Sequence, residues 1–428
     1  MQTVSLEWKT ACAHRDAAAT VQITDHDGLP LADRDVIIEQ KSHAFGFGNI
    51  GFDFIGLAND EADADTPVFG GASPQVAADL VDRFFDVFNM ATLPFYWAGF
   101  EPERGRPDTA RFLRAARWIR DYGATPKGHP LAWHTLAPEW LLDLSVDEIE
   151  AAVRSRITRE VTDFSGVVDL WDAINEVVIM PVFDKYDNGL TRLCQARGRV
   201  ETVRLAVQTA REANPGVQLL LNDFNMSPAY ERLIEECLDA GIEFDALGLQ
   251  SHMHQGYWGE EKTLEVLERF ARFGLPLHMT ETTLLSGDLM PAHIEDLNDY
   301  QVESWPSTPE GLARQADEVE RHYRTLVGHP AVDAVTYWGF TDAGAWLGAP
   351  VGLVDAAGEP KPSFDALRRL VKGEWWVPPT RVRTDGHGCV RVSGFAGQYE
   401  ARGADRADGD GVVFALDGTG EDVRVVVE

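Results

Sequence analysis

Short apolar runs alternate with amphipathic stretches along most of this chain. The amphipathic stretches place apolar residues three and four positions apart, which is the spacing of one helix face. The apolar runs are nearly continuous, as expected of strands buried on both faces of a sheet. The predicted helices span residues 110–122, 146–164, 198–214 and 312–327. The predicted strands begin at His43, Phe88, Ala124, Leu170, Gln218, Ala246, Leu277 and Val335.

This alternation predicts an α/β fold with a parallel sheet and crossover helices. Eight strand–helix units are the number that closes a (β/α)8 barrel, the TIM barrel, which takes about 250 residues or more. An open doubly wound sheet is the alternative, but no GxGxxG or GxxxxGK[ST] motif follows any strand. We therefore predict a TIM barrel over residues 43–375, and we expect no cofactor.

The two ends of the chain carry a different pattern. Strand-like sequences at residues 20–25 and 36–41 flank a turn cluster that contains Gly and Pro. Near the other end, short β-like pieces recur between Gly and Asp turns. We predict an N-terminal β segment over residues 1–42 and a C-terminal β-rich segment over 376–428. Together they would form a small accessory β domain.

Charge and composition exclude several classes of partner. With 38 basic and 69 acidic residues, the formal net charge is 38 − 69 = −31. Such a charge repels nucleic acid and anionic membranes. No stretch approaches the ~18 apolar residues of a membrane span. The first residues lack a basic n-region and an apolar h-region. We predict a cytoplasmic protein, or a secreted one if a signal was removed. Its 4 cysteines lie far apart without a CxxC pair and are predicted to be reduced.

Two glutamates end apolar runs at matched places. Glu176 follows the fourth predicted strand and Glu281 ends the seventh. In a TIM barrel the carboxyl ends of the strands form the catalytic face. Two facing carboxylates suffice to cleave a glycosidic bond, since one protonates the leaving oxygen and the other attacks the anomeric carbon. One such glutamate alone could be a solvated surface residue, whereas two favour catalysis. We predict Glu176 as acid/base and Glu281 as nucleophile.

Six motifs around these glutamates occur in a recognisable order. They are Gly128–His134, Trp171–Glu176, Leu221–Asn225, Gln250–His252, Thr280–Glu281 and Trp338–Asp342. In order and content they resemble glycoside hydrolase family 10, best known for endo-β-1,4-xylanases with a retaining mechanism. The resemblance covers about residues 43–375 and implies the same barrel, the same pair of glutamates and a carbohydrate substrate.

The resemblance also implies roles for other residues. Those implied to contact the sugar or support the glutamates are His129, Trp133, Asn175, Gln250, His252, Trp338 and Trp346. His129 and Trp133 would line subsite −1, which holds the sugar that is transferred to the enzyme. Asn175 would bond the sugar 2-hydroxyl, a contact that strengthens in the transition state. Two further residues, His252 and Gln250, would support Glu281, and Trp338 and Trp346 would stack on the sugar.

The chain departs from the family pattern at strand two. There the family carries a Glu-Asn pair and a Lys that hold the sugars at subsites −2 and −1. Here residues 88–97 are two residues shorter and aromatic, with Tyr96 and Trp97 in that place. A long loop at residues 284–308 carries Trp305 and is predicted to form a pocket wall. Since aromatic walls discriminate less strongly than hydrogen-bonding sites, the reaction type is better predicted than the sugar.

A second departure lies beside the nucleophile. Thr283 stands where the family has an aspartate, so His252 is expected to lack that anionic partner. His252 and His254 form an H-x-H pair, but without a third ligand at motif spacing we expect no metal.

Several functions stay open at this level. The first is a retaining β-glycosidase acting on xylan fragments. The second is the same chemistry on a non-xylan β-glycoside or a disaccharide glycoside taken up by the cell. The third is a non-catalytic sugar-binding relative, which the presence of both glutamates disfavours.

Overall fold

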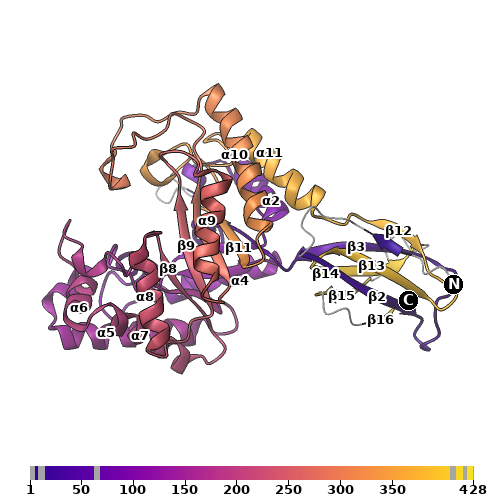
Figure 1. The fold of residues 1–428 in the computed structure, drawn as a ribbon, viewed down its shortest axis with the longest axis horizontal. Helices are drawn as coiled ribbons and strands as arrows, with labels where there is room; N and C mark the ends of the chain where they lie inside the picture. Colours follow the sequence, from indigo (N-terminus) through magenta and orange to yellow (C-terminus); the bar gives the residue numbers. More distant parts are fainter. Residues whose placement is uncertain (1–4, 8–14, 62–67, 405–410, 418–421, 428) are drawn as a thin grey trace. The chain divides into compact units, whose positions relative to one another are not determined.

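The computed structural model (Figure 1) describes residues 5–7, 15–61, 68–404, 411–417 and 422–427. The chain forms two compact units. The smaller contains residues 1–46, 323–330 and 365–428, and the larger contains 47–322 and 331–364. Domain boundaries at residues 42 and 375 stay a prediction.

The larger unit contains a closed barrel of parallel strands. Its order is β10-β11-β4-β5-β6-β7-β8-β9. The bounds are β4 (Gly46–Ile50), β5 (Met90–Pro94), β6 (Thr125–His129), β7 (Leu170–Asn175), β8 (Gln218–Asp223), β9 (Ala246–His252), β10 (Leu277–Thr283) and β11 (Val332–Tyr337). Strands such as β7 are buried at every residue, as a sheet covered on both faces requires. The predicted TIM barrel is confirmed.

Helices alternate with these strands along the chain (Figure 1). They are α1 (Phe54–Leu57), α2 (Pro74–Val87), α3 (Trp97–Phe100), α4 (Thr109–Asp121), α5 (Val146–Asp163), α6 (Gly189–Arg197), α7 (Arg199–Ala213), α8 (Pro228–Asp239), α9 (Gly259–Ala271), α10 (Pro309–Val327) and α11 (Pro362–Arg369). The start of α5 shows how local sequence sets a boundary. The Ser145 hydroxyl accepts the Glu148 amide, and the Glu148 carboxylate accepts the Ser145 amide, which makes a capping box.

Four strand starts differ from the sequence prediction. Strands β5, β6 and β11 begin at Met90, Thr125 and Val332 instead of Phe88, Ala124 and Val335. The first barrel strand begins at Gly46, whereas His43 ends β3 (Asp35–His43) in another sheet. His43 pairs there with Gly397 of β14 (Gly397–Gly403). The apolar and β-prone sequence runs through both strands, so hydrophobicity alone does not reveal where one sheet ends.

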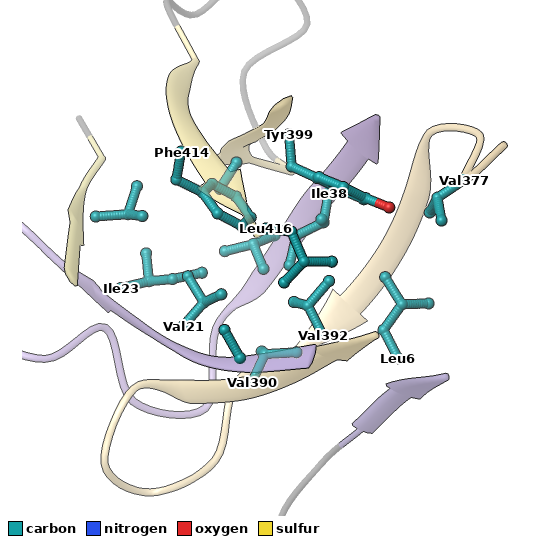
Figure 2. Packing of buried hydrophobic residues seen from close by; sticks show 14 of the residues in the cluster. Leu6, Val21, Ile23, Ile38, Val377, Val390, Val392, Tyr399, Phe414 and Leu416 are labelled. Carbon is teal, nitrogen blue, oxygen red and sulfur yellow. The ribbon is translucent and has the colours of Figure 1, made fainter. Parts of the chain in front are cut away.

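The smaller unit consists of two four-stranded sheets with the orders β1-β13-β2-β16 and β12-β3-β14-β15. Its remaining bounds are β1 (Ser5–Glu7), β2 (Asp16–Thr24), β12 (Thr380–Arg383), β13 (Cys389–Phe395), β15 (Val412–Leu416) and β16 (Val423–Val426). Buried and less buried residues alternate along β2 and β3, the period of two expected when one face packs on a core. Figure 2 shows that core, to which both sheets contribute, including Val21, Ile38 and Phe414. The predicted accessory β domain, built from both ends of the chain, is confirmed.

Two further predictions concern thiols and membranes. Cys194, Cys237 and Cys389 carry free thiols, and Cys12 lies outside the described residues. Within the described part of the chain, no helix is long and apolar enough to cross a membrane.

The barrel allows no side chain at Gly128. A Cβ there would lie 2.1 Å from Cε3 of Trp171, which is fully buried. We expect Gly128→Ala to destabilise the protein by about 1–3 kcal/mol, the usual cost of overpacking. Calorimetry of the variant against wild type measures it. Gly99→Ala is the control, because no atom lies within 4 Å of its Cβ position. Equal melting temperatures for all three proteins would contradict the expectation.

Candidate active site

Backbone irregularities direct both predicted catalytic glutamates. Glu176 follows β7 with a φ of 57°, a left-handed conformation that is unusual for a residue other than glycine. Its amide donates to the Asn222 carbonyl at 2.9 Å. Glu281 lies within β10, where the pairing register with β9 shifts between Met279 and Glu281. Such irregularities re-aim side chains and are frequent next to active sites.

Two hydrogen bonds hold the carboxylate of Glu281. Asn222 Nδ2 donates to Oε1 at 3.0 Å, and His252 Nε2 lies 3.1 Å from Oε2. The residue is only 5% exposed. Burial by itself would raise the pKa of Glu281, but the hydrogen bond from His252 and the fields of His129 and His252 lower it below the usual value. The structure thus favours an ionised Glu281.

Glu176 has the opposite electrostatic character. Trp133 Nε1 donates to Oε2 at 2.8 Å, and Asn175 Nδ2 and Gln250 Nε2 lie 3.2 and 3.3 Å from Oε1. Burial, followed by the negative charge of Glu281, raises the pKa of Glu176 to about 8. At neutral pH this carboxyl group is therefore protonated and can donate a proton.

A chain of amides links the two glutamates. Asn175 Oδ1 accepts from Asn222 Nδ2 at 2.8 Å and from Gln250 Nε2 at 3.0 Å. Asn222 Oδ1 in turn accepts from the Thr280 hydroxyl at 2.6 Å. Neighbouring β9 leaves room for this amide, because a Cβ at Gly248 would lie 2.4 Å from Asn222 Oδ1. The orientations of Glu176 and Glu281 are thereby coupled through fixed side chains.

His129 is held from beneath by a buried ion pair. Its Nδ1 lies 2.6 Å from Asp172 Oδ2, and Lys127 Nζ lies 2.9 Å from Asp172 Oδ1. All three side chains are about 1% exposed or less. Burial opposes ionisation of Asp172, but Lys127 and His129 hold its pKa below the usual value. With Nδ1 engaged, the other ring nitrogen of His129 is left for the pocket.

Aromatic rings surround the glutamates on the side of β4, β5 and β6. The Tyr96 ring lies 5.6 Å from Trp133 and 5.8 Å from both His129 and Phe52. Phe52 in turn meets Trp338 edge-on at 5.7 Å. Burial, and then the charges of Glu281, Glu176 and Asp172, raise the pKa of Tyr96. The phenol is therefore favoured in its neutral form.

Trp97 does not join this wall. Its ring is 3% exposed, its Nε1 donates to Glu101 Oε2 at 3.0 Å, and the Arg156 guanidinium lies 4.8 Å from the ring centre. It occupies the first turn of α3, where Tyr96 is the N-cap residue. Adjacent residues here point in different directions, so only one of the two aromatic residues reaches the pocket.

Trp346 and Trp305 lie on the other side of His252. The Trp346 ring is 36% exposed and 5.0 Å from the His252 ring. Trp305 lies deeper, with its ring 6.2 Å from His254 and its Nε1 donating to the Asp288 carbonyl at 2.8 Å. Trp346 is thus available to a ligand, whereas Trp305 packs inside its own loop, residues 284–308.

The Thr283 side chain, where the family has an aspartate, bonds residues that follow His252 in the chain. The Thr283 hydroxyl accepts the Met253 amide at 3.0 Å and lies 3.4 Å from His254 Nδ1. The anionic contact of His252 is Glu281 itself, and His252 Nδ1 has no hydrogen-bond partner among the described residues. Nor does that part of the chain gather three His, Cys, Asp or Glu side chains that could hold a metal ion.

Sequence reasoning assigned no role to four residues of this site. They are Phe52, Lys127, Asp172 and Asn222. Asp172 and Asn222 stand within recognised motifs, on β7 and β8, and their place in those motifs was the available signal. Phe52 lies in the loop after β4, where nothing in the sequence distinguishes a pocket residue from a core residue.

Comparison with known proteins agrees with this geometry. A family model, Glycosyl hydrolase family 10, matches residues 74–370. Endo-1,4-beta-xylanase B of Thermotoga neapolitana is 27% identical over 292 residues, covering 64% of this chain and 78% of that protein. An endo-1,4-beta-xylanase of Geobacillus stearothermophilus is 27% identical over 262 residues, covering 56% and 75%.

Solved structures show the same fold. Native xylanase 10B from Thermotoga maritima matches with a TM-score of 0.59 at 22% identity, covering 77% of this chain and 95% of that one. Xylanase 10B from Thermotoga petrophila, solved in complex with xylobiose, matches with a TM-score of 0.61 at 22% identity, covering 77% and 94%. Since the family model spans more than half of the chain, this protein belongs to glycosyl hydrolase family 10 and is an enzyme that hydrolyses glycosides.

Proposed function

We propose that this enzyme is a retaining β-glycosidase with Glu281 as nucleophile and Glu176 as acid/base. The observation that carries the proposal is the opposite electrostatics of the two carboxyl groups. Glu281 is favoured in its ionised form, and Glu176 in its protonated form. Paired titratable groups whose environments push their pKa values apart mark the acid and the base of an active site.

In the first step, a Glu281 oxygen attacks the anomeric carbon while Glu176 protonates the leaving oxygen, so the glycosidic bond breaks and a glycosyl-enzyme ester forms. In the second step, the Glu176 carboxylate removes a proton from water. The resulting hydroxide attacks the same carbon, and the ester bond breaks to release the Glu281 carboxylate. Glu176 keeps the proton taken from water and is ready for the next turnover. Asn175, between the two glutamates, would bond the sugar 2-hydroxyl.

The sugar-binding wall supports a short substrate. The relatives are named endo-1,4-beta-xylanases, which makes xylan fragments the first candidate. However, Phe52 and Tyr96 pack against each other on the side of His129 and Trp133. An aromatic wall at that place offers few polar contacts to a second sugar on the glycone side, the part of the substrate transferred to Glu281. A short β-linked glycoside, from xylan or another source, fits this arrangement best.

Loss of either glutamate should have a distinct signature. Glu281→Gln should abolish turnover, because a neutral amide does not attack the anomeric carbon. In Glu176→Ala, kcat/KM should fall about 10²–10⁴-fold for substrates with poor leaving groups. The variant should retain activity on dinitrophenyl β-glycosides, whose leaving group needs no proton. Azide should rescue it by forming a β-glycosyl azide. Steady-state kinetics and product NMR measure these effects.

Glu235→Gln, at a side chain 47% exposed, is the control and should behave as wild type. Full activity of Glu281→Gln would exclude it as nucleophile. A protein that binds xylo-oligosaccharides but hydrolyses none of these substrates would be the non-catalytic relative.

The pH dependence of kcat/KM should follow the two carboxyl groups. Activity requires protonated Glu176, so it should fall as pH rises through about 8. It also requires ionised Glu281, so the acid limb should lie below the usual glutamate range. In Glu176→Ala, assayed with a dinitrophenyl glycoside, the basic limb should disappear. A basic limb that persists in this variant would belong to another residue.

The aromatic wall should make kcat/KM depend on the length of the substrate. We expect kcat/KM on aryl β-xylosides and short xylo-oligosaccharides to exceed that on polymeric xylan. Tyr96→Ala should raise activity on substrates with two or more glycone sugars relative to aryl β-xyloside. Tyr122→Ala, at an exposed ring stacked on Phe85, is the control. A mixed ladder of long products from xylan would contradict the short-substrate proposal.

A further inference from the structure

An ion-pair bridge joins the loops that follow the two glutamate-bearing strands. We call residues 176–188 the β7 loop and residues 284–308 the β10 loop. Lys185 Nζ of the β7 loop lies 2.6 Å from Asp299 Oδ1 and 3.3 Å from Asp296 Oδ2 of the β10 loop. The β10 loop is the long segment that leads into α10 in Figure 1.

The bridge runs over the β8–β9 side of the barrel mouth. Strands β8 and β9 separate β7 from β10 in the barrel order. Gln255, just after β9, donates its Nε2 to the carbonyls of Pro291 and Ile294 at 3.0 and 2.7 Å. The Met290 amide also donates to the His254 carbonyl at 2.9 Å. The β10 loop therefore contacts the residues just after β9 before it reaches Lys185.

That side lies opposite the aromatic wall. Phe52, Tyr96, His129 and Trp133 belong to the loops and ends of β4, β5 and β6, and they surround the position proposed for the transferred sugar. The leaving group, or aglycone, must therefore extend toward β8 and β9, beneath the bridge.

The root of the β10 loop is buried, whereas the ion pairs at its tip are exposed. Trp305, Leu285 and Met290 belong to one buried cluster at the root, and the Ser286 and Ser307 hydroxyls lie 2.7 Å apart. The tip carries the bridge, in which the Lys185 side chain is 46% exposed and those of Asp296 and Asp299 are 37% and 59% exposed. Exposed ion pairs are weak and screened by salt.

Lys185 is the only lysine or arginine in either loop, and both loops are otherwise acidic. Asp184 and Asp187 flank it on the β7 loop. Asp187 is already paired with Arg192. Among the described residues, the ion pairs that join the two loops are those of Lys185.

We propose that Lys185 is a specificity-determining residue whose bridge closes the aglycone end of the site and restricts the enzyme to short leaving groups. The proposal rests on the proposed retaining β-glycosidase activity. Together with the aromatic wall it defines the substrate class: short β-glycosides bounded at both ends, rather than internal bonds of a long polymer.

The test compares aryl β-xyloside, which has a one-ring aglycone, with xylohexaose. In Lys185→Gln, kcat/KM for xylohexaose should rise about 2–5-fold or more, the effect of an exposed ion pair on an equilibrium, while kcat/KM for aryl β-xyloside stays unchanged. In wild type, 0.5 M NaCl should raise the xylohexaose-to-xyloside ratio in the same direction. Lys185→Gln should show no such salt effect, because its bridge is already absent.

The matched control is Arg272→Gln. It removes the ion pairs of a guanidinium that is 48% exposed with Glu235 and Glu231, whose side chains are 47% and 15% exposed, at the end of α9 that precedes β10. It should keep the wild-type ratio and the wild-type salt response. An active Lys185→Gln with an unchanged ratio would overturn the bridge proposal while leaving the glycosidase intact. Absence of hydrolysis by wild type on aryl β-xyloside, aryl β-glucoside and every xylo-oligosaccharide would instead overturn the proposed function.

Discussion

Two carboxyl groups buried close together cannot both ionise without a large cost in free energy, and the rest of this site follows from that constraint. Burial disfavours charge on Glu176 most, and the charge of Glu281 adds to the effect. The hydrogen-bond partners of the two glutamates also differ, because only Glu281 is bonded to a histidine, His252. Glu281 is thus favoured in its ionised form and Glu176 in its protonated form, the pair of states that the proposed double displacement needs before each turnover.

The barrel makes this asymmetry possible because it brings six strands to one mouth. His129, Asn175, Asn222, Gln250, Glu281 and Trp338 come from β6, β7, β8, β9 and β10 and from the end of β11. Their mutual hydrogen bonds cross from strand to strand, so each side chain is fixed by neighbours far away in the sequence. Beneath them the Lys127–Asp172 pair keeps a buried charge compensated and orients His129. A buried ion pair of this kind contributes orientation more than stability.

Specificity is placed in different elements from catalysis. Of the two proposed catalytic residues, Glu281 lies on β10 and Glu176 directly follows β7, whereas Phe52, Tyr96, Trp346 and Lys185 lie in the loops that follow strands. Loops accept substitution without loss of the barrel. Under the proposed function, such a separation lets the loops change the substrate while the strands keep the two glutamates in place.

The sequence by itself determined the barrel, the accessory β domain and the glutamate pair. These features follow from local patterns: continuous apolar runs, helical periodicity and carboxylates at two strand ends. Such patterns can be recognised without knowing which residues are neighbours in space. It also indicated the contact of His252 with Glu281 through the family resemblance. It did not determine that Trp97 turns into the interior while Tyr96 faces the pocket, because that depends on a single N-cap turn.

Tertiary structure alone decided which groups share the pocket. Phe52 reaches Tyr96 only because β4 and β5 are neighbours. Asn222 reaches Glu281 because β9, which separates their strands, carries Gly248 at the crowded position. The Lys185 bridge joins residues more than a hundred positions apart. Such contacts arise from the closure of the barrel and from loop packing above it, and no periodicity in the chain encodes them.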